Sequence, residues 1–322
     1  MGMENNSQKD KAIARSILET LIYFDIFSHP LSFDEIIDYC NYPKLQKEDG
    51  LRVLDQLKSG NLINYHKGFY FLGNDESWVT RRQEENRLAD KRLKTAVRYS
   101  RLIANFPYVR GVLISGSLSK HVMKPDSDID FFIITKPGRL WACRAFLTFF
   151  KKLFLGDSYR NFCINYFIDS ESLEIPDKNV FTATEIAFLL PMYNYKLYQE
   201  FLDSNQWYRA EYPNFRNRPE NVQIKPVFIK DMLEFLFNNR IGEWIDKKSF
   251  SIITRYWQNK FSYLDQASYA LNFRSLKNVS KHHPNDFQQK VLKEYYEKIA
   301  AYKSFAGLNP DDSGNPIVNQ RA

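Results

Sequence analysis

The stretch GVLISGSLSKHVMKPDSDIDFFIIT, residues 111–135, contains two apolar runs that are separated by small, polar and acidic residues. The first run, 112–114, leads into Gly116 and Ser117. A glycine lets the backbone approach a ligand closely, and a helix that begins there presents free N–H groups to phosphate. This half of the stretch therefore predicts a strand followed by a phosphate-binding turn.

Two aspartates come just before the second apolar run, 131–134. Asp128 and Asp130 flank Ile129, and side chains alternate between the two faces of a strand, so we expect both carboxylates on one face. Asp126 is the other acid nearby, but the residue between it and Asp128 is polar, so we assign Asp126 to the preceding loop.

Neighbouring carboxylates repel each other, and a divalent cation removes that cost. Hard oxygen ligands suit Mg²⁺, which commonly binds one or two carboxylates together with substrate phosphates. In a two-metal site, one ion activates the attacking oxygen and the other stabilises the leaving group. The stretch therefore predicts a phosphate-binding turn and a Mg²⁺ site on adjacent strands.

This pattern resembles the signature of the nucleotidyltransferase superfamily that includes DNA polymerase beta, and especially its small bacterial members. That signature is a hydrophobic residue, Gly, then Gly or Ser, a gap, and then Asp, hydrophobic, Asp or Glu, hydrophobic. Gly116, Ser117, Asp128, Asp130 and the hydrophobic residues beside these acids occupy those places in order.

The resemblance implies an enzyme that transfers a nucleoside monophosphate from an NTP to an acceptor hydroxyl and releases pyrophosphate. Asp128 and Asp130 would bind Mg²⁺, with two ions present once NTP is bound, while Gly116 and Ser117 would hold the β and γ phosphates. Lys120 would assist as a point charge. The acceptor stays open: a small molecule, a protein or a nucleic acid.

The family often continues its Gly-Ser loop with Ala-Arg-Gly. This chain has Ser119, Lys120 and His121 there, so a histidine stands in place of the usual glycine. Contact between His121 and the nucleotide is left open by the sequence.

Many family members place a third carboxylate on a later strand. The expected strand, 162–168, has Asn165 at its polar middle position; its amide oxygen can bind a metal but cannot act as a base. Asp169 is expected on the same face by alternation, at the strand end. Two interpretations remain: an active site of two acids helped by Asn165, Asp169 or an acid elsewhere such as Glu185, or a site that binds nucleotide without turnover.

The amino-terminal part has the pattern of three helices and a hairpin. Residues 12–27 and 46–58 have helical apolar spacing, and Ser32 with Glu35 forms the capping-box pattern of a short helix between them. A two-stranded hairpin follows around Lys67 and its neighbouring glycine. This order resembles a winged helix-turn-helix domain. Acids in the third helix favour an intramolecular or protein-contacting role over DNA binding.

Composition sets the remaining limits. The 322 residues suit two or three cores, and 26 Phe with 20 Tyr exclude a disordered chain. Three cysteines support neither a disulfide framework nor a zinc site. The polar start, 1–11, lacks a signal peptide, and no run is long enough to cross a bilayer, so we expect a cytoplasmic protein without membrane contact. Residues 205–322 hold 18 basic and 12 acidic side chains, which suits either a polyanion partner or an ordinary solvated surface.

We therefore expect an α+β protein with a nucleotidyltransferase mixed β-sheet core. The expected parts are a winged helix-turn-helix domain over 1–75, a connecting helix and catalytic core over 76–178, a helical domain over 179–308 and a flexible tail over 309–322. Helices are expected at the following ranges: 182–203, 228–241, 250–263 and 286–305. The alternatives are a nucleotide-sensing DNA-binding regulator, or an antitoxin-like interaction protein with an inactive transferase core.

Overall fold

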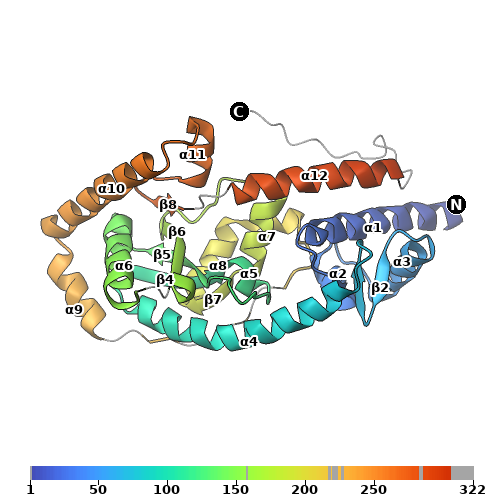
Figure 1. Cartoon of the computed structure of the whole chain (residues 1–322), viewed down its shortest axis with the longest axis horizontal. Helices are drawn as coiled ribbons and strands as arrows, with labels where there is room; N and C mark the ends of the chain where they lie inside the picture. Colours follow the sequence, from blue (N-terminus) through green and yellow to red (C-terminus); the bar gives the residue numbers. More distant parts are fainter. Residues whose placement is uncertain are drawn as a thin grey trace. The chain divides into compact units, whose positions relative to one another are not determined.

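The computed structural model divides the chain into two compact units (Figure 1). Unit 1 combines residues 1–79 with 288–322, and unit 2 comprises 80–287. Both units contain helices and a sheet, which confirms the expected α+β class. The expected tail, 309–322, lies outside the described residues. The structure describes residues 2–156, 159–216, 219, 224–225, 228–282 and 286–305.

The amino-terminal part of unit 1 contains three helices and a small sheet of short strands. Its strands pair antiparallel in the order β1-β3-β2. In chain order the elements are α1 (Gly2–Asp25), β1 (Leu31–Ser32), α2 (Phe33–Tyr39), α3 (Lys47–Ser59), β2 (Asn64–His66) and β3 (Phe69–Phe71).

Two local signals in this unit are confirmed. At the start of α2, the Ser32 backbone N–H donates to Glu35 Oε2 at 2.8 Å and Ser32 Oγ accepts from the Glu35 N–H, so the capping box is complete. Between β2 and β3, Lys67 and Gly68 have φ of +46° and +89°. Two successive positive φ angles are those of a type I′ turn, whose twist matches the flanking strands.

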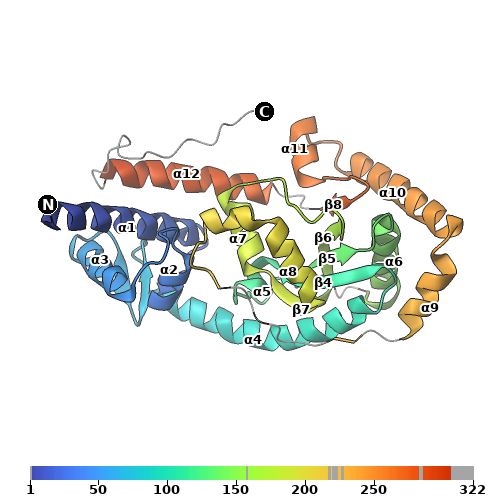
Figure 2. The same ribbon diagram turned by 180° about the vertical axis from the view of Figure 1, so that it is seen from behind.

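The last helix, α12 (Phe287–Phe305), packs on α1 within unit 1 (Figures 1 and 2). The Tyr295 and Tyr23 ring centroids lie 5.8 Å apart, and Lys298 Nζ lies 2.7 Å from Asp25 Oδ2. The structure thus groups all but the first residue of α12 with the amino-terminal helices, whereas the sequence placed this helix in a helical domain over 179–308.

Unit 2 is built on a mixed sheet of strand order β7-β4-β5-β6-β8, in which β5 and β6 are parallel and the other described pairs are antiparallel. A long helix, α4, leads into it from unit 1. The elements are α4 (Ser77–Ala104), β4 (Val109–Ser115), α5 (Gly116–Ser119), β5 (Asp130–Thr135), α6 (Leu140–Phe154), a 3₁₀ turn (Tyr159–Asn161), β6 (Cys163–Asp169), α7 (Val180–Phe188), β7 (Leu190–Tyr193), α8 (Tyr195–Ser204), a second 3₁₀ turn (Gln206–Ala210), α9 (Phe228–Phe237), α10 (Arg240–Lys260), α11 (Gln266–Asn272) and β8 (Val279–Lys281).

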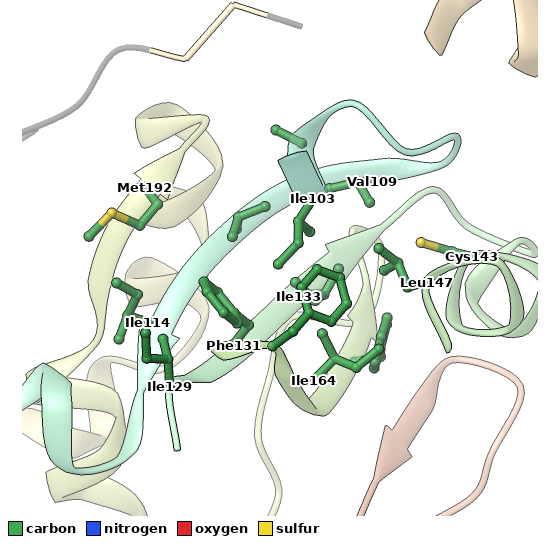
Figure 3. Packing of buried hydrophobic residues seen from close by; sticks show 14 of the residues in the cluster. Ile103, Val109, Ile114, Ile129, Phe131, Ile133, Cys143, Leu147, Ile164 and Met192 are labelled. Atoms are coloured by element: carbon green, nitrogen blue, oxygen red, sulfur yellow. The ribbon is translucent and has the colours of Figure 1, made fainter. Parts of the chain in front are cut away.

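Helices cover both faces of this sheet. On one face, Phe131 and Ile133 of β5 pack with Ile164 of β6 and with residues of α4 and α6 in one buried cluster (Figure 3). On the other face, Phe132 of β5 stacks on Tyr166 at 5.0 Å and meets Phe201 of α8 edge-on at 5.4 Å. Alternation along β5 therefore divides the core into two layers.

The part of the expected helical domain up to residue 287 falls within unit 2 together with the sheet. The helix expected over 182–203 is interrupted by β7, because Pro191 cannot donate a helical hydrogen bond and is tolerated in this edge strand. The Asn239 side chain accepts from the N–H groups of Ile241 and Gly242 and so caps the start of α10. This helix continues through residues 242–249, the interval between the helices expected over 228–241 and 250–263. Among the helices that the structure describes, none has the length and apolar content to cross a bilayer.

Replacing Tyr295 by Ala tests the assignment of α12 to unit 1. Tyr295 is 9% exposed and its neighbour Tyr296 is 56% exposed. We expect Tyr295→Ala to lower the free energy of unfolding of unit 1 by about 3 kcal/mol, because it removes a buried aromatic side chain. Chemical denaturation followed by circular dichroism measures the change. Tyr296→Ala is the matched control, and equal effects of the two variants would contradict the assignment.

Candidate active site

The end of β4 meets the start of β5 at the centre of the candidate site. Ser115 is paired with Asp130 in the antiparallel register, and Gly116 follows with φ of +67°. A Cβ built on Gly116 would fall against Oδ2 of Asp130 and lie 3.2 Å from its Cγ. Only glycine suits this position, because it accepts the positive φ and leaves room for the carboxylate.

Asp128 and Asp130 lie on either side of a buried residue. Ile129 is fully buried, its N–H donates to Arg160 O at 2.6 Å, and its carbonyl accepts from Cys163 N–H at 3.0 Å. These bonds extend the pairing of β5 and β6 to residue 129, although β5 itself begins at Asp130. Both aspartates are partly exposed, as expected for two side chains that point away from the core on which Ile129 packs.

Strand β6 brings an amide and a thiol to Asp130. Asn165 Nδ2 donates to Asp130 Oδ1 at 2.5 Å, and Cys163 Sγ donates to Asn165 Oδ1 at 2.9 Å. The structure therefore brings Asn165, the residue that the sequence singled out on this strand, into contact with Asp130 of β5. Cys163 was not singled out from the sequence, although its spacing of two residues from Asn165 is the signal that could have found it.

Asp169 is not brought to the site. It pairs with Thr135 at the far end of β5, while Cys163 pairs with Asp130. The expectation that it shares a face with Asn165 is wrong. Ile164 pairs with Phe131 and Tyr166 pairs with Phe132, so Asn165 lies in a bulge, and the alternation of side chains after it is shifted by one residue. Asp169 is buried, and it accepts from the Glu171 N–H at 3.1 Å.

Glu185 of α7 is the acid that the fold supplies from outside the sheet. Lys120 Nζ lies 2.7 Å from Glu185 Oε1 and donates to Gly116 O at 3.1 Å. The glycine turn, the lysine and the α7 acid are thus connected by direct contacts. The partly exposed Ser117, the second residue expected at the phosphates, lies next to Gly116 with its Oγ 4.0 Å from Met123 Sδ.

The surroundings make Asp130 hard to ionise. Burial raises the pKa of its carboxyl group to about 7, and the negative charges of Asp128 and Glu185 act in the same direction. The thiol of Cys163 and the charge of Lys120 oppose this shift. A cation placed among these acids would favour the ionised form.

His121 is held away from the turn by α4. Its Nε2 lies 2.8 Å from Asp90 Oδ1 and its Nδ1 lies 2.7 Å from Asn86 Nδ2. His121 has φ of +59°, so the residue that stands where the similar family has glycine adopts the backbone conformation that glycine favours. Histidine is among the residues enriched there.

Arg92 of α4 fixes the backbone just before Asp128. Its guanidinium donates to the Ser127 carbonyl at 3.1 Å, to Asn161 Oδ1 at 2.6 Å and to the Arg160 carbonyl at 3.3 Å. One side chain therefore ties the segment before Asp128 to the segment before β6. No local sequence signal marks this role, since Arg92 is one of many charged residues in α4.

The oxygen ligands of Asp128 and Asp130 suit a cation that takes most of its other ligands from water and from a bound substrate. Within the described part of the chain, no three His, Cys, Asp or Glu side chains converge as a ready-made metal site. Mg²⁺ often uses one or two carboxylates and completes its shell with water and phosphate oxygens. Asp128 and Asp130 match that requirement, and Asn165 adds an amide beside them.

The raised pKa of Asp130 predicts a pH-dependent stability difference between the wild type and Asp130→Asn. Between the ordinary value of 3.8 and about 7 the folded state retains a proton that the unfolded chain has lost, so wild-type stability falls as pH rises through this range. The variant avoids that loss. Relative to the wild type, it should therefore gain up to about 4 kcal/mol at pH 8 and almost nothing at pH 4.

Urea denaturation at both pH values measures the difference. Asp126→Asn is the control, because Asp126 is exposed and its replacement should change stability little at either pH. A stability difference between Asp130→Asn and the wild type that is the same at both pH values would contradict the raised pKa of Asp130.

Comparisons with known proteins leave the site to be judged on its own chemistry. No protein-family model, no curated protein and no solved structure matched the chain.

Proposed function

We propose that unit 2 is a Mg²⁺-dependent nucleotidyltransferase that moves a nucleoside monophosphate from an NTP to an acceptor hydroxyl with release of pyrophosphate. The observation that carries the proposal is the contact of Gly116 with Asp130, with Asp128 beside it. A backbone turn and a pair of carboxylates at the adjoining ends of two neighbouring strands are what a triphosphate and its cation require.

Each residue then has a defined task. Gly116 and Ser117 would approach the β and γ phosphates with their backbone, and Lys120 would supply positive charge next to them. Asp128 and Asp130 would hold Mg²⁺, which when bound neutralises phosphate charge. Positioning and charge neutralisation supply most of the rate in phosphoryl transfer, so the rigid support of these side chains matters more than proton transfer.

Glu185 is the best-placed residue for the task that a third carboxylate performs in the similar family. It reaches Lys120 directly, and its charge contributes to the raised pKa of Asp130. In the proposed enzyme it would orient Lys120 and accept the proton of the acceptor hydroxyl. The amide of Asn165 cannot accept a proton in this way.

A nucleotide-binding protein without turnover is the second candidate. The observation that favours it is Asn165, an amide in contact with Asp130 at the strand position where the similar family has an acid. The element order α1-β1-α2-α3-β2-β3 and the sheet order β1-β3-β2 support a winged helix-turn-helix interpretation of unit 1, as a DNA-binding regulator would need.

The charges of α3 weigh against DNA binding by that helix. Each of its basic side chains has an acidic neighbour: Arg52 contacts Asp10 and Asp49 at 2.7 Å, while Lys47 lies 2.7 Å from Asp34 and Lys58 3.4 Å from Asp55. Phosphate contacts depend on uncompensated Lys and Arg. An interaction with protein suits this surface better.

Substitution of the paired acids tests the proposed activity. With each labelled NTP, Mg²⁺ and a panel of acceptors, Asp128→Asn and Asp130→Asn should reduce pyrophosphate release at least about 1000-fold, because both remove cation-binding charge. Asp126→Asn and Asp169→Asn are the controls and should retain activity to within about twofold, since neither side chain belongs to the site. Turnover that survives Asp128→Asn would contradict the assignment.

Glu185→Gln separates turnover from nucleotide binding. We expect a fall in the rate constant of about 100-fold with little change in the dissociation constant of a non-hydrolysable NTP analogue, because loss of a general base affects the chemical step. The control is Glu174→Gln, whose side chain is 59% exposed in its pair with Lys178. Equal rates for Glu185→Gln and the wild type would remove Glu185 from the mechanism, and activity in neither would favour the binding-only candidate.

A further inference from the structure

Helix α10 carries a row of side chains at four-residue spacing that faces away from the core. The row, which we call the α10 ridge, contains three apolar or aromatic residues and two lysines. Its members are Trp244, Lys248, Ile252, Tyr256 and Lys260. Residues four apart lie next to each other on a helix, each about 40° further around the axis, so the five side chains form a continuous row that winds gradually around α10.

The apolar members of the ridge are exposed to an unusual degree. Trp244 is 60% exposed, Ile252 66% and Tyr256 55%. The opposite side of α10 is occupied by the core, where Phe250 and Trp257 pack on Trp141 of α6 at 4.9 and 6.1 Å between ring centroids. The ridge is therefore not part of the packing of unit 2.

Two aromatic–lysine pairs repeat along the ridge. Lys248 Nζ lies 6.0 Å from the Trp244 ring centroid, and Lys260 Nζ lies 5.9 Å from that of Tyr256. The two pairs are twelve residues apart, which corresponds to about 18 Å along the helix. Each pair offers a flat ring and a positive charge side by side.

The charge of the helix selects the partner. All exposed charged side chains of α10 are basic except Glu243, and Asp246 accepts from the Ala142 N–H at 2.8 Å. The exposed basic residues of α10 are Arg240, Lys247, Lys248, Arg255 and Lys260. A second copy of this surface would bring like charges together, whereas a polyanion would neutralise them.

We propose that the α10 ridge binds single-stranded nucleic acid, with bases stacked on Trp244 and Tyr256 and phosphates against the lysines. Base stacking on exposed aromatic side chains combined with a basic track is the general mode of sequence-tolerant single-strand binding. A duplex keeps its bases stacked on each other, so the rings would have no faces to contact. This inference concerns binding alone and is independent of nucleotide transfer at the Asp130 site.

Fluorescence anisotropy of the full chain with labelled single-stranded and duplex oligonucleotides of the same sequence tests the ridge. We expect the single strand to bind at least about tenfold more tightly than the duplex, and Trp244→Ala or Tyr256→Ala to weaken single-strand binding about tenfold each. A plot of the logarithm of the binding constant against the logarithm of salt concentration has a negative slope, and Lys248→Gln should reduce the magnitude of that slope by about 0.7. These exposed substitutions should leave the unfolding midpoint unchanged.

Two controls match the ridge variants elsewhere in the chain. Tyr65 is 50% exposed with Lys58 Nζ at 5.6 Å from its ring centroid, so Tyr65→Ala removes a similar aromatic–lysine pair in unit 1. Lys196 has a side chain that is 86% exposed, so Lys196→Gln matches Lys248→Gln. Neither control should change binding by more than about twofold if the lost contacts are those of the ridge.

Four results would overturn the proposal. The first is equal affinity for duplex and single strand, which would indicate contact with the phosphate backbone alone. The second is single-strand binding that Trp244→Ala and Tyr256→Ala leave unchanged, and the third is no binding of the wild type even at low salt. The fourth is concentration-dependent self-association of the wild type that both variants abolish, which would make the ridge an interface between copies of this chain.

Discussion

The carboxylate of Asp130 lies against a residue that has no side chain, and the candidate site depends on this contact. Gly116 combines a positive φ with a position where a Cβ would collide with that carboxylate. Any other residue would have to move either the end of β4 or the start of β5, which are joined through the Ser115–Asp130 pair. The turn and the acid are therefore held together by the sheet itself, before any ligand binds.

The rest of unit 2 supports that contact from several directions. Strand β6 adds Asn165 through its bulge, α7 adds Glu185 through Lys120, and α4 fixes the backbone before Asp128 through Arg92. These groups come from distant parts of the sequence. Their convergence leaves Asp130 with a pKa raised to about 7 by burial and neighbouring charge, an arrangement that costs stability at neutral pH. Stability sacrificed in this way is typical of functional sites.

Local patterns predicted the local parts of this arrangement. The capping box of Ser32, the hairpin at Lys67 and the contact of Gly116 with Asp130 all involve residues close together in the sequence. Three features did not: β7 breaks an apparently continuous helix at Pro191, a bulge turns Asp169 to the other face, and α12 returns to unit 1. A strand pairing, a register shift and the choice of packing partner depend on the whole fold, so periodicity within one segment cannot specify them.

The measurement that tests the central claim most directly is a crystal structure of the protein with Mn²⁺ and a non-hydrolysable NTP analogue. Anomalous scattering locates the ion without reference to the protein coordinates. The account predicts an ion within about 2.2 Å of carboxylate oxygens of both Asp128 and Asp130, with the triphosphate lying on the backbone of Gly116 and Ser117. An ion bound elsewhere, or a nucleotide whose phosphates avoid that turn, would contradict it.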